Sequence, residues 1–378
     1  MITHVETTAI FSGLEADWRT LQQDGIATPY QTYDWIKAWT DVLATPSGLE
    51  PMLVSGRDAS GRVVAILPLV MQSTPLGVKA HFMGGKHANF NMGIFSRQAM
   101  EQLGAKDMEK LLSEAAGRCG VDAFHFTHQP RQWLGLDNPL ARLPHRVSAN
   151  SAFKAELMAD SDAMIRSLMS SESRKKLRHK EKRLSELGAV RLERACDSAT
   201  VTHVLDTFRS QKAARLRSLG IADPFADPHV ARFLRDAALN GVEQKEAAIE
   251  LYSLMAGPRI VAILGGAMHA GRLSGMFTSF DCDPAVMRYS PGDLLLLHLV
   301  QKLCREGVAV FDLGTGEAAY KGDYCQLDEP LFDSILPMTA KGRVLASGLS
   351  ATQRIKSWAK HNPRAMALVA RLRKLRAK

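Results

Sequence analysis

Hydrophobic positions in the first 160 residues alternate between helical and strand-like spacing. Apolar side chains recur every three or four residues near 18–21 and 35–39, which predicts two helices. Two unbroken apolar runs, 51–55 and 63–70, predict a pair of strands. The glycine-rich stretch 83–93 interrupts this pattern, and its glycines are typical of backbone that turns tightly or approaches a ligand. The pattern predicts a mixed α and β unit over residues 1–160.

A basic helical connector follows over residues 161–188. Its apolar stripe covers 165–169 and resumes at Leu177, Leu184 and Leu187, while the other faces carry eight Lys and Arg side chains. We expect Ser161 to cap this helix at its N-terminus and Gly188 to end it. Two interpretations stay open, a functional basic surface or a solvated linker helix between two halves.

Residues 189–342 predict one alternating series of elements and no sequence repeat. The series is a strand, two helices, three antiparallel strands, a helix, a strand, a short helix and a last strand. The expected bounds are strand 190–193, helices near 198–215 and 227–240, strands near 248–255, 259–267 and 272–281, helix 291–306, strand 308–313, a short helix, and a last strand near 331–336. The fold class expected is α/β (α+β), with mixed, largely antiparallel sheets flanked by helices.

The net charge of +9 belongs to the end of the chain. Residues 343–378 hold ten Lys or Arg and no Asp or Glu, which leaves 38 basic and 39 acidic side chains, a net of −1, elsewhere. Leu368, Leu372 and Leu375 form one stripe of a helix that we expect to begin near Asn362. A basic amphipathic helix is typical of a peripheral membrane anchor. Nucleic acid is the competing partner, but no aromatic side chains are interleaved for base stacking, so we favour a membrane surface.

Composition excludes several other classes. No apolar run approaches the roughly 18 residues that span a bilayer, and the N-terminal segment lacks the pattern of a signal peptide. The five cysteines form no CxxC pair, which favours a reducing cytoplasm and predicts neither a disulfide framework nor a metal site. No neighbouring motif makes Cys325 a nucleophile with His298 or His269 as its base.

A strand-to-helix turn at 311–321 concentrates polar groups on glycine-rich backbone. Asp312 ends the strand and is expected to bind substrate. Gly314 and Gly316 open the turn and are expected to let a co-substrate approach.

Three further side chains of this turn suit acyl transfer to an amine. That reaction needs a base for the ammonium nucleophile and an acid for the leaving thiolate. Glu317 can be the base, and Tyr320 and Lys321 lie one helical turn beyond it. Lys321 can stabilise an oxyanion or a phosphate. The alternative is a glycine-rich turn with an exposed Glu–Lys pair.

The helix that begins at Pro291 is a second candidate site. Ser290 is expected to be its N-cap, and Gly292 allows a ligand close to the free amides of the first turn. These amides can hold a pyrophosphate, to which Arg288 adds positive charge. Asp293 places an anion in the same turn and competes with a phosphate. An ordinary capped helix remains the alternative.

The third candidate is the loop Lys86-His-Ala-Asn-Phe-Asn91. His87 lies among glycines and asparagines on a loop, where a histidine is more often functional than on an apolar helix face. Asn89 and Asn91 point outward if the segment is extended, and both can orient an acceptor. The alternative is a histidine that only closes a turn.

Several of these motifs together resemble a known family. The segments that carry the resemblance are Tyr30-Gln-Thr-Tyr-Asp-Trp35, the basic connector, Tyr289-Ser-Pro-Gly-Asp-Leu-Leu295 and Phe311-Asp-Leu-Gly-Thr-Gly-Glu-Ala-Ala-Tyr-Lys321. The chain resembles, over roughly residues 10–340, bacterial GNAT-like acetyltransferases often described as cellulose-biosynthesis-associated. The resemblance implies two GNAT-like halves, similar to the Fem-type peptidoglycan aminoacyltransferases, with ligands between the halves. It also implies that Tyr320 protonates the leaving thiolate. The sequence departs from the Gln/Arg-x-x-Gly-x-Gly/Ala pattern of CoA-binding acetyltransferases, most clearly at Asp293.

Some members of this family look like bacterial ceramide synthases, and the 84–91 loop and the basic tail favour that branch. We therefore expect an N-acyltransferase that uses acyl-CoA as co-substrate, without a tightly bound cofactor, and acylates a lipid amine such as a sphingoid base. We expect it at the cytoplasmic face of the membrane, with the 311–321 turn facing the 86–91 loop across a cleft. The alternatives are acetylation of an exopolysaccharide precursor, a tRNA-dependent aminoacyl transfer of the Fem type, plain RNA binding and a non-catalytic scaffold.

Overall fold

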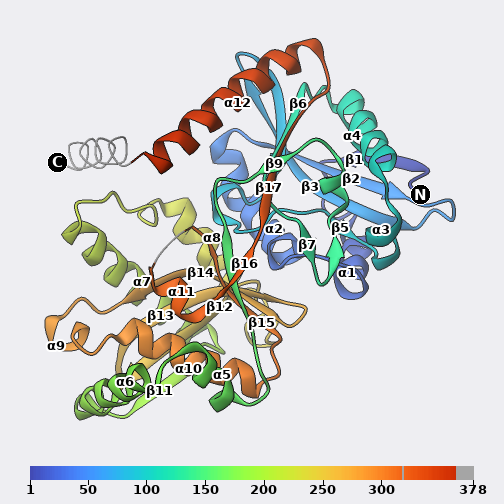
Figure 1. Ribbon diagram of the computed structural model, residues 1–378. Coiled ribbons are helices and arrows are strands. Elements are labelled where there is room, and N and C mark those ends of the chain that lie inside the picture. Colours follow the sequence, from blue (N-terminus) through green and yellow to red (C-terminus); the bar gives the residue numbers. More distant parts are fainter. Residues whose placement is uncertain (317–318, 363–378) are drawn as a thin grey trace. The chain divides into compact units, whose positions relative to one another are not determined.

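The chain folds into two compact units, each with its own sheet. The computed structural model describes residues 1–316 and 319–362 (Figure 1). The first unit consists of residues 1–151 and of the segment that starts at Glu329, and the second unit consists of residues 152–328. Each unit is described by itself.

The first unit is built on a mixed sheet in the order β1-β2-β3-β4-β6-β17-β9, with β5 added beside β3. Its strands are β1 (His4–Thr8), β2 (Glu50–Arg57), β3 (Val63–Thr74), β4 (Gly77–Phe82), β5 (Ile94–Phe95), β6 (Ala123–Pro130), β9 (Arg146–Val147) and β17 (Leu331–Pro337), beside a small hairpin of β7 (Gln132–Trp133) and β8 (Leu136–Asp137). Its helices are α1 (Glu15–Asp24), α2 (Tyr33–Trp39), α3 (Arg97–Gln102), α4 (Ala105–Cys119) and α12 (Ala340–His361). Trp18 in α1 and Trp35 in α2 are fully buried, so the helical periodicity near the N-terminus was predicted correctly.

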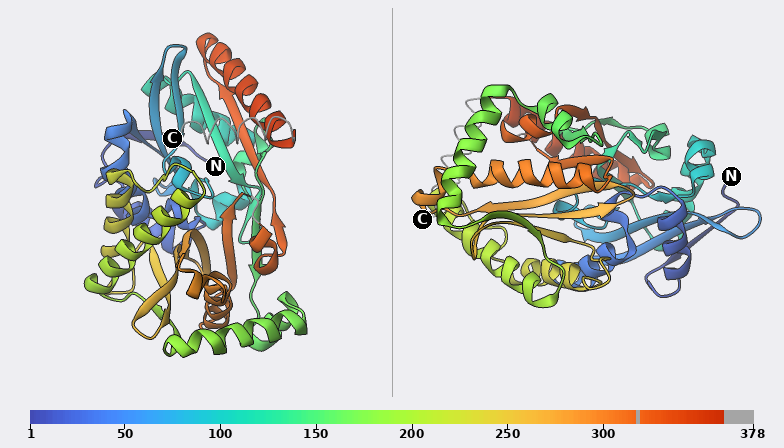
Figure 2. Two further views of the ribbon diagram at one scale, coloured as in Figure 1. Left: turned by 90° about the vertical axis from the view of Figure 1, so that its left-hand side faces the viewer. Right: turned by 90° about the horizontal axis from the view of Figure 1, so that it is seen from below.

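The second unit has a sheet in the order β11-β12-β13-β14-β15-β10-β16. Its strands are β10 (Ala152–Glu156), β11 (Val190–Arg194), β12 (Glu250–Ala256), β13 (Arg259–His269), β14 (Arg272–Phe280), β15 (Val310–Thr315) and β16 (Leu327–Glu329). Its helices are α5 (Ser161–Leu168), α6 (Ser171–Leu184), α7 (Ser198–Ser218), α8 (Pro228–Leu239), α9 (Pro284–Met287), α10 (Pro291–Arg305) and α11 (Ala319–Tyr324). The sheet lies between α10 on one face and α7 and α8 on the other (Figure 2, right). The predicted order of elements from residue 189 to α11 is confirmed, except that the short helix α9 was not predicted.

The two sheets repeat one topology. In the first unit, the antiparallel strands β2, β3 and β4 lead through α4 to β6, which pairs with β4 in parallel. In the second unit, β12, β13 and β14 lead through α10 to β15, which pairs with β14 in parallel. The strand pairs β1–β2, β3–β5, β6–β17 and β9–β17 of the first sheet and β11–β12 and β10–β15 of the second are antiparallel. The expectation of two halves with mixed, largely antiparallel sheets is confirmed.

Each half expected from the sequence contributes one strand to the sheet of the other unit. Strand β10, which follows the first unit in the chain, pairs with β15, and β17, which follows the second unit, pairs with β6 and β9. The prediction that the strand near 331–336 ends the C-terminal half is therefore wrong about its place. The compact units also divide differently from the expected boundaries at residues 160 and 342. Residue spacing predicts a strand but does not show which sheet receives it.

The basic connector is two packed helices. Met169 is extended and separates α5 from α6. The expected N-cap Ser161 is wrong, because the carboxylate of Asp160 accepts the hydrogen bonds from the first free amides of α5, and Ser170 caps α6 in the same way. Leu177 and Leu184 are buried and α5 and α6 pack against α10. The connector is therefore an integral part of the second unit.

Helix α12 begins before the expected basic tail. It packs on β4, β6 and β17 of the first unit, with Leu345 buried. The stripe expected through Leu368, Leu372 and Leu375 lies outside the described residues. Within residues 1–316 and 319–362, no helix is both long and apolar enough to cross a membrane.

Candidate active site

The candidate site of the second unit lies where β14 and β15 stop pairing. Their parallel ladder joins Arg272 to Val310, Leu273 to Phe311 and Ser274 to Asp312, and it ends there. Strand β14 nevertheless continues to Phe280, and β15 to Thr315. The carboxyl ends of the two strands therefore do not pair with each other. The first turn of α10 lies close to the end of β14, since a Cβ at Gly292 would lie 3.8 Å from the ring of Phe280. In α/β proteins this edge of a parallel pair is a common place for ligands.

Asp312 is a buried hub at the end of the ladder. Its carboxylate accepts hydrogen bonds from Arg272 Nε at 2.7 Å, from Ser274 Oγ at 2.8 Å and from the Gly314 amide at 2.8 Å. Asp312 and Ser274 are fully buried, and Arg272 is almost so. We expected Asp312 to bind substrate, but its oxygens are taken up by protein donors. Its contacts fix β14, β15 and the following turn relative to one another.

Lys321 closes the turn from the other side. Its ammonium donates to the carbonyl oxygens of Thr315 at 2.8 Å and Gly314 at 3.4 Å, and its side chain is buried. Burial lowers its pKa, and the negative charge of Asp312 opposes this shift. Gly314 and Gly316 both have positive φ, at 70° and 94°, a conformation that glycine adopts at little cost. A Cβ at Gly316 would meet no atom within 4 Å, so this part of the turn is open.

Two of the expected catalytic groups cannot be placed. Glu317 lies outside the described residues. Tyr320 belongs to the backbone of α11, but its side chain also lies outside the description. Their roles as base and acid remain predictions.

The first turn of α10 has open amides. Ser290 precedes the helix in a left-handed conformation, with φ 52° and ψ 58°, and its side chain makes no capping bond. The expected N-cap role is therefore wrong: the Ser290 hydroxyl instead accepts a hydrogen bond from Lys180 Nζ of α6 at 2.7 Å. Pro291 has no amide hydrogen. No hydrogen bond from the amides of Gly292 and Asp293 to any described residue is found.

Charge around this helix start is mixed. The guanidinium of Arg288 lies over the ring of Tyr289, 4.8 Å from its centroid. Burial raises the pKa of Asp293, and the positive charge of Lys180 opposes that shift. Tyr324 of α11 donates a hydrogen bond to the Asp293 carbonyl at 2.8 Å and so ties α11 to α10. The acidic side chain expected to compete with a phosphate is thus partly buried and lies near a lysine.

The corresponding positions of the first unit are filled. At the start of α4, the carboxylate of Asp107 accepts the hydrogen bond from the Gly104 amide. Where β4 and β6 stop pairing, the rings of Phe82 and Phe126 lie 4.7 Å apart and both are buried. The end of the parallel ladder in the second unit therefore has no open counterpart in the first.

The 86–91 loop lies in the first unit and is tied to its core. His87 Nδ1 accepts a hydrogen bond from Trp39 Nε1 at 3.2 Å, and the amide of Asn89 donates to Tyr30 Oη at 2.6 Å. Asn91 is buried and donates to the carbonyl of Thr127, so the expectation that it points outward is wrong. The pairing of this loop with the 311–321 turn stays a prediction.

Cys325 is placed as a structural thiol. It is fully buried, its Sγ donates to the Phe311 carbonyl over 3.7 Å, and burial raises its pKa to about 12. His298 pairs with Glu181 at 2.9 Å instead. Within the described residues, no group of three or more His, Cys, Asp and Glu side chains is placed to hold a metal ion.

Three residues of the site escaped the sequence analysis. Lys180 donates a hydrogen bond to Ser290, which lies 110 positions later in the sequence. Arg272 and Ser274 donate to Asp312, which lies 40 and 38 positions later. Only the excess of basic residues in the connector was a signal for Lys180. For Arg272 and Ser274 there was none, because the parallel register that aligns them with Asp312 is set by tertiary structure.

Comparison with known proteins identifies part of the chain. Residues 171–322 match the acetyltransferase (GNAT) domain model. No curated protein sequence matches the chain. The fold is similar to that of FemX (TM-score 0.59, 9% identity, covering 88% of this chain and 97% of that one). It is also similar to the C-terminal domain of a candidate lysylphosphatidylglycerol synthetase from Agrobacterium fabrum (0.52, 13%, 90% and 95%) and to L-PGS from Bacillus licheniformis (0.52, 11%, 90% and 95%). At these identities the structural likenesses show the fold alone, whereas the domain match identifies residues 171–322 as a GNAT-type acetyltransferase domain.

Proposed function

We propose that the chain transfers an acyl group from a CoA thioester to an amine and that the donor binds to the second unit. The observation that carries this proposal is the start of α10, where the amides of Gly292 and Asp293 have no partner among the described residues and Lys180 lies beside them. This helix start lies within the GNAT-type domain, close to the end of β14.

The open first turn suits a pyrophosphate. Free amides at a helix start and the positive end of the helix dipole favour an anion. Lys180 adds a full positive charge, and the burial of Asp293 favours its neutral form. In the first unit, the buried rings of Phe82 and Phe126 fill the matching end of the parallel ladder, which supports a single donor site, in the second unit.

The 311–321 turn is proposed to carry the chemistry. The amine, deprotonated by Glu317, attacks the thioester carbonyl and forms the C–N bond. The C–S bond then breaks, and the leaving thiolate takes a proton from Tyr320. Lys321 holds the carbonyls of Gly314 and Thr315 and so fixes the turn that presents these groups. Its lowered pKa brings it closer to neutrality than a surface lysine.

A lipid amine is our proposed acceptor. This proposal is supported by the basic end of the chain, where residues 343–378 hold ten Lys or Arg and no acidic residue. Such a segment binds anionic membrane surfaces, and a long-chain amine partitions into the same membranes. His87 and Asn89 of the first unit are proposed to orient the acceptor.

The test is an assay of the full chain with acyl-CoA and sphinganine, in which free thiol and the amide product are measured together. We expect equal amounts of both, lower kcat for Glu317→Gln and Tyr320→Phe, and little change in KM for acyl-CoA. Absence of thiol release at every acyl chain length would overturn the proposed donor. Thiol release with acetyl-CoA and an amino sugar, but not with sphinganine, would overturn the proposed acceptor.

A Fem-type aminoacyl transfer from tRNA is the second candidate. It is supported by the basic face of α6 and by the fold shared with FemX. It predicts amide formation from aminoacyl-tRNA, without CoA, and binding of tRNA that weakens steeply with salt.

A further inference from the structure

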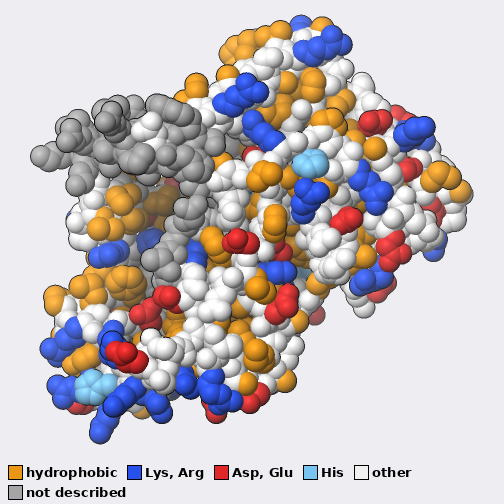
Figure 3. Space-filling view, viewed as in Figure 1, with side chains coloured by type: hydrophobic (Ala, Val, Ile, Leu, Met, Phe, Trp, Pro, Cys, Tyr) orange, Lys and Arg blue, Asp and Glu red, His pale blue; other side chains and the backbone are white. Residues whose placement is uncertain are grey.

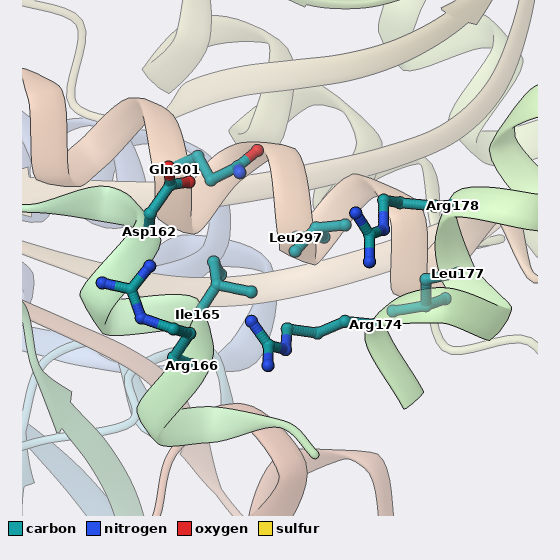
Figure 4. A pocket seen from close by; sticks show the side chains of 8 residues that line it. All are labelled: Asp162, Ile165, Arg166, Arg174, Leu177, Arg178, Leu297 and Gln301. Atoms are coloured by element: carbon teal, nitrogen blue, oxygen red, sulfur yellow. The ribbon is translucent and has the colours of Figure 1, made fainter. Parts of the chain in front are cut away.

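A hollow between α5, α6 and α10 gathers three arginines on an apolar floor. Its volume is about 240 Å³, and its lining includes the side chains of Ile165, Leu177, Leu297, Arg166, Arg174 and Arg178. We call it the arginine groove. Figure 4 shows Arg174 and Arg178 reaching into it from α6, while the guanidinium of Arg166 lies on the α5 side, beside Asp162. All of these residues belong to the second unit.

Two of the three arginines of the groove have no ion-pair partner within the described residues. Arg166 pairs with Asp160 at 3.6 Å, but no ion pair or hydrogen bond of Arg174 or Arg178 to another described side chain is found. The Nε of Arg174 is moreover buried and has no hydrogen-bond partner. A buried donor of a charged group without an acceptor destabilises the fold unless an anion completes it.

The rest of α6 shows what a solvated basic face looks like. Lys175 and Lys176 are exposed, and Lys176 pairs with Glu172 at 2.7 Å. Figure 3 shows Lys and Arg side chains gathered over the part of the surface where Figure 1 places α6. Arg174 differs from these lysines because its guanidinium is partly withdrawn from water and faces a hollow.

We propose that the arginine groove binds the phosphate of an organic phosphate ester, at a site separate from the donor site. Guanidinium groups present planar pairs of N–H donors that match phosphate oxygens. The floor of Ile165 and Leu297 is apolar, which suits the carbon part of the ester. Asp162 at the rim disfavours ligands with several phosphates close together. The chemistry fits both a soluble phosphate ester and the headgroup of a phospholipid.

The experiment is a calorimetric titration of the full chain with glycerol 3-phosphate, at constant ionic strength and with CoA present to occupy the donor site. Vesicles of phosphatidylcholine, with and without phosphatidic acid, form the second arm. We expect Arg174→Gln and Arg178→Gln to weaken binding at least tenfold. The matched control Lys175→Gln removes the same charge from the exposed face of the same helix, and we expect a change of less than twofold. Urea unfolding of each variant checks that it is folded.

Binding in either arm, lost in the arginine variants and kept in Lys175→Gln, supports the proposal. Binding to glycerol 3-phosphate identifies a soluble ester, and binding to acidic vesicles alone identifies a lipid headgroup. An equal loss in Lys175→Gln would overturn the proposal, because the effect would then be general electrostatics. Absence of binding by the unsubstituted chain, or displacement of the ester by CoA, would overturn it as well.

Discussion

Arg272 and Asp312 form a buried ion pair, with Nε and Oδ2 2.7 Å apart, that joins the first rung of the parallel ladder between β14 and β15 to its last rung, at Asp312. Beyond this rung the two strands no longer pair with each other. The pair therefore lies at the point where a continuous sheet gives way to the candidate site, and the same carboxylate also holds the Gly314 amide that starts the turn.

Asp312→Ala is expected to destabilise the second unit. It leaves the Arg272 guanidinium buried without its partner, and breaking such a pair costs about 3–5 kcal/mol in the free energy of unfolding. Urea unfolding measures this loss. The control is Glu193→Ala, which breaks an exposed pair with Arg191 and should cost about 0–1 kcal/mol. Equal costs for the two variants would contradict the role given to Asp312.

Lys180→Gln is expected to weaken donor binding while the fold is kept. A hydrogen bond from a charged donor contributes about 1.5–3 kcal/mol, so KM for acyl-CoA should rise by roughly tenfold or more. The change in kcat should be small, because Lys180 contacts Ser290 at the helix start and not the turn at 311–321. Lys182→Gln, on the exposed face of α6, is the matched control. If both variants raise KM equally, the charge of the helix as a whole is responsible.

Cys325 is expected to be unreactive in the folded protein. Its pKa of about 12 leaves almost no thiolate at pH 8, whereas Cys196 is exposed. Titration with a disulfide reagent should therefore modify Cys196 first and Cys325 only on unfolding, with Cys196→Ser as the control. Because folding raises the thiol pKa, Cys325 also lowers stability as pH rises from 9 toward 12, since the unfolded thiol ionises first. Fast labelling of Cys325 in native protein would contradict its burial.

Deletion of residues 363–378 should separate membrane binding from folding. The deletion leaves α12, whose packing on β4, β6 and β17 stabilises the first unit. We expect an unchanged melting temperature, loss of binding to anionic vesicles, and full activity on a short-chain, water-soluble amine. A deletion that starts at residue 343 removes buried Leu345 and should lower stability as well. Vesicle binding that survives the shorter deletion would assign it to another surface.

The order of elements could be predicted because local spacing determines it. Buried Trp18, Trp35 and Leu177 all fall on helical stripes that the sequence displays. Helix starts were harder to predict. Ser161 and Ser290 both have the residue type of an N-cap, but Asp160 caps α5 instead of Ser161, and Ser290 has a left-handed conformation and makes no capping bond. The residue type gives a preference for the N-cap position, and the conformation of the preceding loop decides whether the side chain caps the helix.

Groups brought together over long distances in sequence could not be predicted. Lys180 meets Ser290, and Arg272 meets Asp312, through packing and strand register that no local pattern encodes. The unpartnered Nε of Arg174 likewise becomes visible only once α6 is placed on α10. The sequence predicted where polar groups gather, but it did not distinguish substrate contacts from groups that hold the backbone, as Asp312 does.

The return of β17 to the first sheet sets a condition on the order of synthesis. The amide of His128 in β6 donates to Asp333 beside it in β17, 205 positions later in the chain. On the ribosome, the first sheet therefore waits with an open β6 edge until the second unit has been made, and such an edge can pair with other chains. Contacts this distant in sequence also make folding slow. A gene that encodes residues 1–151 alone should for this reason yield aggregated protein, whereas co-expression of a segment that contains β17 can complete the first sheet.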